Sequence, residues 1–218
     1  MVKIYCDGAD LEKMAELAVN PIIEGWTTNP TIIRKAGVTN YHDFAQAVLK
    51  IVNGKSVSFE VFADDFEMME KQAVEIASWG PNVYVKIPIT NTKGESSLSL
   101  VERLKDINVN LTAVMTERQI EAAIQILKPN DILSVFVGRI TDTQAAPHFF
   151  WQEKRPCRTL WASAREVYNV TLAERYGYDI ITLTPDLIAK LPLKGKNLAQ
   201  YSLETVRQFH EDGKGIKF

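Results

Sequence analysis

Three ionisable side chains fall on the polar faces of β-rich segments that are otherwise aliphatic. They are one lysine, Lys86, and two carboxylates, Glu60 and Asp7. Successive side chains of a strand point to opposite faces, so each group lies across its strand from a row of apolar neighbours. If those rows pack against helices, all three groups point into the interior of a sheet. Buried ionisable groups are costly unless paired or functional, which makes these the first candidates for chemistry.

A buried lysine beside carboxylates can perform Schiff-base chemistry. An amine attacks a carbonyl only in its unprotonated form, which burial and nearby positive charge favour. The resulting imine accepts electrons when a neighbouring C–C bond breaks, and a carboxylate within reach transfers the protons. The residues alone therefore indicate an aldol reaction on Lys86. The alternative is a structural ion-pair network without catalysis.

Amides and hydroxyls share the interior face with these three groups. The same alternation predicts that a further set points inward: Asn29, Asn110, Thr112, Ser134, Phe136 and Ser163. In the segment that contains Ser163, it predicts Trp161 inward and Leu160 and Ala162 outward. Most of the polar members lie near the carboxyl ends of their strands, where barrel enzymes keep their active sites.

Eight β-rich runs hold these side chains, and stretches of helical period separate them. The runs are Val2–Asp7, Ile22–Asn29, Ser56–Phe62, Asn82–Pro88, Ile107–Val114, Asp131–Gly138, Arg158–Ser163 and Asp179–Thr184. Alternating β and α units predict a parallel sheet, and eight of them predict an α/β fold of the (β/α)8 TIM-barrel type. The alternative is an open doubly wound sheet, but no glycine-rich phosphate loop follows the first run.

Helix caps mark several of the intervening helices. The expected caps are Asp10, Asn40, Asp64 or Asp65, and a capping box of Thr116 with Gln119. The helix around Ala145–Gln152 has the weakest pattern, because Pro147 interrupts it. A last helix, about 200–212, is expected to pack on the barrel or on a neighbouring subunit.

Composition restricts the class of protein. Of the 218 residues, 46% are hydrophobic, which is enough for one packed domain over 1–218. The formal net charge of -2 gives no electrostatic footprint for nucleic acid or a membrane surface. Cys6 and Cys157 are expected to be free thiols, and no targeting or membrane-spanning run is evident, which favours a cytoplasmic protein. The histidines show no metal-ligand spacing, so neither a metal nor a cofactor is expected.

Six short motifs in a fixed order resemble those of the transaldolase family, and in particular its short single-barrel members, which include fructose-6-phosphate aldolase. The motifs are Thr27-Thr28-Asn29-Pro30, Ser58-Phe59-Glu60-Val61, Val85-Lys86-Ile87-Pro88, Asn110-Leu111-Thr112, Phe136-Val137-Gly138-Arg139 and Ala162-Ser163-Ala164-Arg165. The similarity runs from Asp7 to about Pro185. Each motif alone is weak, but six in order at expected strand ends are specific.

The resemblance implies a role for each matched residue. Lys86 would form the Schiff base, Asp7 would take the proton of the substrate hydroxyl, and Glu60 would act with a water held by Thr112. Substrate binding would involve Asn29, Asn110, Ser134 and Phe136 near the reacting carbons, and Arg139, Ser163 and Arg165 at the terminal phosphate. The partners would be sugar phosphates and further copies of the chain, in a pentamer or decamer, within the pentose phosphate pathway.

Some residues have simpler explanations, and two features depart from the family pattern. Asn29 before Pro30 can be a plain helix cap, and Arg139 and Arg165 can be solvated charges. Gly8 follows Asp7 where the family has a hydroxyl residue, which puts the local support of Asp7 in doubt. The connection 147–158 is also atypical and can reshape the mouth of the site or a subunit contact.

Three functions remain open from the sequence. A transaldolase transfers a dihydroxyacetone unit from a ketose phosphate to an aldose phosphate, whereas a fructose-6-phosphate aldolase releases free dihydroxyacetone. Glu60 and Phe136 match the transaldolase pattern, since the aldolases carry Gln and Tyr at these places. The third possibility, from another class, is a sugar-phosphate binding protein without catalysis.

Overall fold

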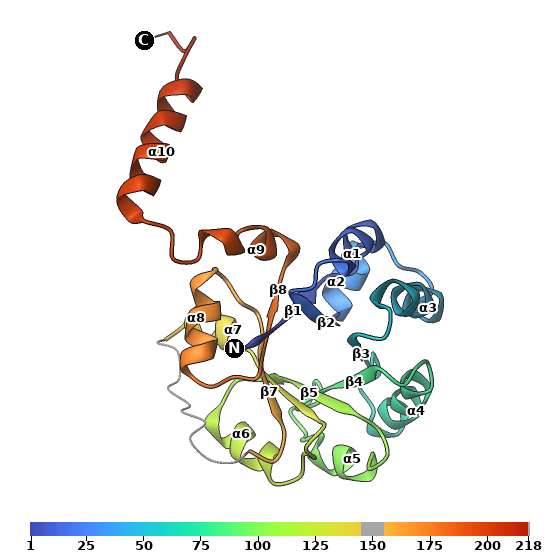
Figure 1. Ribbon diagram of the computed structural model, residues 1–218. Coiled ribbons are helices and arrows are strands. Elements are labelled where there is room, and N and C mark those ends of the chain that lie inside the picture. Colours follow the sequence, from blue (N-terminus) through green and yellow to red (C-terminus); the bar gives the residue numbers. More distant parts are fainter. Residues whose placement is uncertain (145–154, 218) are drawn as a thin grey trace.

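A closed barrel of eight parallel strands forms the centre of the computed structural model, which describes residues 1–144 and 155–217 (Figure 1). Each strand pairs with the next, and β8 pairs with β1 to close the sheet. The strands are β1 Lys3–Asp7, β2 Ile23–Thr27, β3 Ser56–Glu60, β4 Val83–Pro88, β5 Val109–Val114, β6 Ile132–Val135, β7 Arg158–Trp161 and β8 Ile180–Leu183. The predicted TIM barrel is confirmed, and all eight strands lie within the predicted runs.

Helices follow the strands and surround the barrel (Figure 1). Within the described residues they are α1 Leu11–Ala18, α2 Pro30–Lys35, α3 Tyr41–Val52, α4 Phe66–Ala77, α5 Leu98–Arg103, α6 Glu117–Ile124, α7 Val137–Thr141, α8 Tyr168–Arg175, α9 Pro185–Ala189 and α10 Leu198–Asp212, with a 3₁₀ turn, η1, at Leu191–Leu193. The helix expected around Ala145–Gln152 lies outside the described residues. The helices that the structure describes include none long and apolar enough to span a bilayer.

Side-chain caps start the helices as the sequence indicates. Asp10 accepts hydrogen bonds from the first turn of α1, and Thr116 forms the predicted capping box with Gln119 at α6. Asp65 caps α4, whereas Asp64 accepts two hydrogen bonds from Thr92. These caps satisfy backbone N–H groups that a helix start leaves unpaired.

Two apolar regions fill the fold. The larger one lies between the strands and the surrounding helices and contains the outward residues of β1, β3 and β4. The smaller one occupies the inside of the barrel and is formed by Tyr5, Ile132, Leu160, Ala162 and Ile180, with Tyr84 and Phe136 beside it. The interior is therefore a packed core below the polar carboxyl ends of the strands.

The prediction for β7 was wrong. Leu160 and Ala162 belong to the interior cluster, whereas Trp161 packs outside, stacked on Tyr176 with ring centroids 6.2 Å apart. Both faces of this strand are apolar, so the alternation of apolar and polar residues could not tell inside from outside. Ser163 nevertheless reaches the interior, because its backbone adopts a left-handed conformation (φ 61°) that breaks the strand alternation.

A short helix replaces the end of the sixth predicted strand. The sequence predicts a strand to Gly138, but β6 ends at Val135 and α7 begins at Val137. Gly138 lies against the backbone of the β7 end, where an added Cβ would be 1.5 Å from the carbonyl oxygen of Ser163. The glycine is therefore required by this close approach of two chain segments.

Candidate active site

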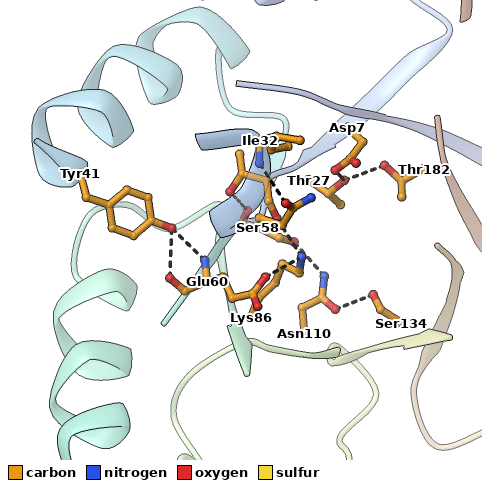
Figure 2. Close-up of polar contacts among 12 residues, drawn as sticks. Asp7, Thr27, Ile32, Tyr41, Ser58, Glu60, Lys86, Asn110, Ser134 and Thr182 are labelled. Atoms are coloured by element: carbon orange, nitrogen blue, oxygen red, sulfur yellow. Dashed lines mark hydrogen bonds and ion pairs between the residues drawn. The ribbon is translucent and has the colours of Figure 1, made fainter. Parts of the chain in front are cut away.

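Lys86 is buried at the carboxyl end of the barrel, where two acceptors hold its ammonium group (Figure 2). Its Nζ lies 2.9 Å from Oε2 of Glu60 and donates a hydrogen bond of 2.8 Å to the carbonyl oxygen of Thr28. The side chains of Lys86 and Glu60 are only 6% and 13% exposed. The pairing follows from the barrel register, which places Glu60 of β3 beside Lys86 of β4. The predicted inward direction of both side chains is confirmed.

Asp7 lies across the same cavity and accepts a hydrogen bond from Thr27, whose hydroxyl also meets that of Thr182. Thr27 Oγ1 donates a hydrogen bond of 2.7 Å to Asp7 Oδ1, and it lies 2.6 Å from Thr182 Oγ1 (Figure 2). Burial raises the pKa of Asp7 above its usual value, and the nearby Lys86 and the Thr27 hydrogen bond oppose this rise. The hydroxyl that Gly8 cannot supply therefore comes from the neighbouring strands β2 and β8.

Neither threonine was among the predicted site residues. The alternation of β2 and β8 carries the signal, because Thr27 and Thr182 each lie at the carboxyl end of a strand, on the interior face. Both threonines could therefore have been predicted from the alternation of these two strands. The carbonyl of Thr28 was missed for a different reason, since no residue-type pattern indicates a backbone acceptor.

Behind the lysine, a buried hydrogen-bond chain crosses three strands. Ser134 Oγ donates to Asn110 Oδ1 (2.6 Å), and Asn110 Nδ2 donates to Ser58 Oγ (3.0 Å). Asn110 is completely buried and does not line the cavity, whereas Ser134 does. In this structure Asn110 orients Ser134, and a direct contact between Asn110 and a substrate would require this chain to rearrange.

Thr112 presents an open hydroxyl to the cavity. Its side chain is 1% exposed, and in the described part of the chain its Oγ1 has no hydrogen-bond partner. The next residue, Ala113, has φ 61°, and the pairing of β5 with β6 is irregular between Leu111 and Val114. A buried hydroxyl without a protein partner at a strand irregularity is a typical place for a bound polar ligand.

Asn29 has both of the roles that the sequence left open, as a helix cap and as a residue of the cavity. Its side chain caps α2 by accepting a hydrogen bond of 3.1 Å from the backbone N–H of Ile32, and Pro30 is the first helical residue. The same residue lines the cavity. The amide nitrogen of the Asn29 side chain is not used by the cap, so it can donate a hydrogen bond to a ligand.

The structure separates the two arginines expected at a phosphate. Arg139 lines the cavity together with Phe136 and Ser163, and its guanidinium lies 5.2 Å from the centroid of the Phe136 ring. Across the described ranges, no carboxylate lies within salt-bridge distance of Arg139. Arg165 does not line the cavity, and its guanidinium pairs with Asp142 at 2.6 Å in a half-exposed position. Of these two arginines, Arg139 is therefore the one placed to meet an anion in the cavity.

The cavity at the carboxyl end of the barrel is small and opens to solvent. Its volume is about 90 Å³, which is below the usual range for ligand pockets. Its lining residues are Asp7, Thr27, Asn29, Lys86, Thr112, Ser134, Phe136, Arg139, Leu160, Ala162, Ser163 and Thr182. Among the residues described, no group of three or more His, Cys, Asp or Glu side chains could hold a metal ion.

The chain matches one family model along almost its whole length. The family model described as Transaldolase/Fructose-6-phosphate aldolase matches residues 4–218. The chain is 30% identical to a probable transaldolase of Methanococcus maripaludis over 211 residues, covering 92% of this chain and 95% of that protein. A probable transaldolase of Mesorhizobium japonicum is 32% identical over 211 residues, with 92% and 94% coverage.

Two solved structures with this architecture share little sequence identity with the chain. Dihydrodipicolinate synthase from Rhodopseudomonas palustris superposes with a TM-score of 0.55 at 14% identity, covering 93% of this chain and 77% of that one. KGPDC from Streptococcus mutans superposes with a TM-score of 0.53 at 10% identity, with 84% and 88% coverage. Similarity at this level concerns the barrel fold alone.

Proposed function

Since the chain belongs to the transaldolase/fructose-6-phosphate aldolase family, we propose that it is a transaldolase that works through a Schiff base on Lys86. The reaction moves a dihydroxyacetone unit from a ketose phosphate, such as fructose 6-phosphate or sedoheptulose 7-phosphate, to an aldose phosphate. One observation carries the proposal: Lys86, buried in a polar cavity, lies 2.9 Å from the Glu60 carboxylate and shares the cavity with Asp7.

The first half of the reaction joins the donor to the enzyme. The unprotonated amine of Lys86 adds to the ketone carbon, and the resulting carbinolamine loses water to give a protonated imine. Glu60 lies close enough to Nζ to transfer the protons of these steps, with a water that the open hydroxyl of Thr112 would hold. Ser134 and the free amide nitrogen of Asn29 offer hydrogen bonds to the donor hydroxyls.

The second half breaks and remakes a C–C bond. Asp7 takes the proton of the donor's hydroxyl as the bond between its third and fourth carbons breaks, and the electron pair moves into the imine to give an enamine. The aldose phosphate product leaves. An acceptor aldose phosphate then takes the enamine carbon at its carbonyl, Asp7 returns the proton, and hydrolysis of the new imine frees Lys86. The raised pKa of Asp7 suits a group that must accept and return one proton.

Phe136 favours transfer over release. Release of free dihydroxyacetone requires protonation of the enamine carbon and attack of water on the imine. A tyrosine hydroxyl at this place could orient that water or supply the proton, whereas the apolar ring of Phe136 can do neither. The enamine is therefore expected to persist until an acceptor arrives, and Phe136→Tyr should increase the release that needs no acceptor.

Two assays test the proposed function. Borohydride reduction with fructose 6-phosphate should add a covalent adduct to the intact protein, and Lys86→Ala should abolish it. Turnover of fructose 6-phosphate should be much faster with erythrose 4-phosphate than without it. No adduct on the unmutated protein would favour a non-catalytic binder, and dihydroxyacetone release as fast as transfer would favour the aldolase.

A further inference from the structure

Tyr41, which lies outside the barrel, contacts the backbone of the residue that pairs with the lysine. It is the first residue of α3, and its hydroxyl accepts a hydrogen bond of 2.9 Å from the backbone N–H of Glu60. The same hydroxyl donates a hydrogen bond of 3.1 Å to the Glu60 carbonyl oxygen (Figure 2). One phenolic group therefore satisfies both backbone groups of Glu60.

The early end of β2 explains why Glu60 needs this partner. The pairing of β2 with β3 stops at Thr27 and Ser58, because the chain after Thr28 turns into α2. The N–H and C=O of Glu60 point to the same side of β3 as the carbonyl of Ser58, which receives the N–H of Thr28. At Glu60, two residues after Ser58, β2 has already ended and no strand of the described chain pairs with this side of β3. The buried N–H and C=O of Glu60 therefore require other partners. The Tyr41 hydroxyl takes the place of the missing strand.

The packing around the tyrosine ring fixes the position of the hydroxyl. The ring stacks on Phe62 with centroids 4.4 Å apart and meets Trp79 edge to face at 5.3 Å. Gln72 of α4 separately accepts hydrogen bonds from the backbone N–H groups of Phe62 and Ala63. Because Gln72 holds the chain after β3 independently, loss of the Tyr41 hydroxyl should act at Glu60 and at Thr28, whose side chain the same hydroxyl also meets.

We propose that Tyr41 is a positioning residue for the reaction, holding the Glu60 backbone so that its carboxylate stays against Lys86. This inference rests on the proposed function, since it assigns Tyr41 to the proton transfers of imine formation. The distance from Glu60 Oε2 to Lys86 Nζ is 2.9 Å. A small backbone shift at the end of β3 would change this distance, and proton transfer depends steeply on such distances.

The test is the rate of adduct formation in Tyr41→Phe, measured by rapid quenching into borohydride at saturating fructose 6-phosphate. This variant keeps the ring contacts and removes only the hydroxyl. The rate should fall about tenfold, as expected when a buried polar pair is left unmade. The concentration of fructose 6-phosphate that half-saturates the rate should change less than about twofold, because Tyr41 does not line the cavity.

Tyr5→Phe is the matched control. Tyr5 is also a buried tyrosine whose hydroxyl binds β3, but it accepts from Ser56 Oγ (2.7 Å) at the opposite end of that strand. Tyr5→Phe loses one hydroxyl hydrogen bond and Tyr41→Phe loses two, so both should lower the thermal midpoint, Tyr41→Phe somewhat more. Only Tyr41→Phe should slow the adduct. In a Glu60→Gln background, Tyr41→Phe should add little further loss, because it acts through the Glu60 carboxylate.

Three results would overturn the inference. These are an unchanged adduct rate in Tyr41→Phe, an equal loss in Tyr5→Phe, or an independent loss when Tyr41→Phe is combined with Glu60→Gln. Absence of any adduct on the unmutated protein would instead remove the proposed function and the inference with it. If Tyr41→Phe does not fold, 4-fluorophenylalanine in place of Tyr41 fills the space of the hydroxyl but provides no donor for the Glu60 carbonyl, and it should lower the rate by a similar factor. A full rate in that variant would count against the role.

Discussion

At the level of single residues, the protonation of Asp7 is set by groups that come from other strands. Asp7 must be ionised to accept a proton from the substrate, so activity should be lost as the pH falls through its pKa. Burial raises this pKa above the ordinary value of 3.8, and the Thr27 hydrogen bond lowers it. The folded state therefore binds the Asp7 proton more tightly than the unfolded state does. Protonation of Asp7 stabilises the fold at low pH, and this contribution is lost as the pH rises through the pKa of Asp7 in the folded state.

Thr27→Val removes the hydrogen bond that opposes the effect of burial. The pKa of Asp7 should rise further, and the acidic limb of the kcat/KM profile should move to higher pH. Thr159→Val is a suitable control, because Thr159 lies at the start of β7, away from the cavity. Its hydroxyl donates a hydrogen bond to Asp179. Two results would contradict this prediction. Either the acidic limb of the kcat/KM profile does not move in Thr27→Val, or it moves by the same amount in Thr159→Val. In both cases Thr27 would not set the pKa of Asp7.

The two arginines should differ in their effect on phosphorylated substrates. Arg139 lines the cavity, whereas Arg165 would have to leave Asp142 to reach a phosphate. Charge-assisted hydrogen bonds are worth roughly 1.5–3 kcal/mol, so Arg139→Ala should lower kcat/KM for fructose 6-phosphate by at least about tenfold. Arg165→Ala should cost less, and unphosphorylated fructose should be little affected by either change. A larger loss in Arg165→Ala would show that the Asp142 pair opens when substrate binds.

At the level of elements, the contact between α7 and the end of β7 allows no side chain at position 138. An alanine Cβ there would lie 1.5 Å from the Ser163 carbonyl oxygen, so the backbone must move. Gly138→Ala should lower the free energy of unfolding by about 1–3 kcal/mol, a typical cost of overpacking. It should also weaken binding of inorganic phosphate, since Ser163 and Arg139 flank the contact. Chemical denaturation and calorimetric titration measure the two effects.

Gly8→Ala is the matched comparison, because its added Cβ would meet only Pro185 Cγ at 4.0 Å. An ordinary van der Waals contact of this kind should leave the free energy of unfolding nearly unchanged. If the two variants were equally stable, the tight packing at Gly138 would not be required for the fold.

Helical and strand periodicity predicted the elements well because each apolar stripe has one place to be buried. Lys86 and Glu60 could be predicted for the same reason, since both interrupt aliphatic strands. The direction of β7 could not be predicted, because Leu160 and Trp161 are both apolar and the alternation gives no sign of which one faces inward. Contacts that depend on backbone atoms or on a helix outside the barrel, as for Thr28 and Tyr41, leave no such pattern in the sequence.

At the level of the whole molecule, α10 is the last helix of the described chain, Leu198–Asp212. It extends away from the barrel (Figure 1), and none of its residues is buried. Val206 and Phe209 are 60% and 68% exposed, on the same face as Leu198. We propose that a second copy of the chain covers this face, in line with the homo-oligomer expected from the sequence.

Val206→Asp combined with Phe209→Asp tests this assembly. The two charges should lower the molar mass measured by light scattering toward that of one chain, 24.6 kDa, because charge cannot be buried cheaply in an apolar contact. Gln208→Asp, outside the apolar face, should leave the mass unchanged. A single-chain mass for the unmutated protein would remove the proposal.

Below the cavity, the barrel interior is filled by Tyr5, Ile132 and Ile180, and the polar groups lie above this layer. Much of the buried apolar surface is therefore separate from the side chains that meet the substrate. An exposed lining residue such as Arg139 can be exchanged without repacking the layer beneath it. This division makes the chain a practical starting scaffold for laboratory evolution, in which saturation of the mouth alters acceptor choice while Lys86 and the interior layer are retained.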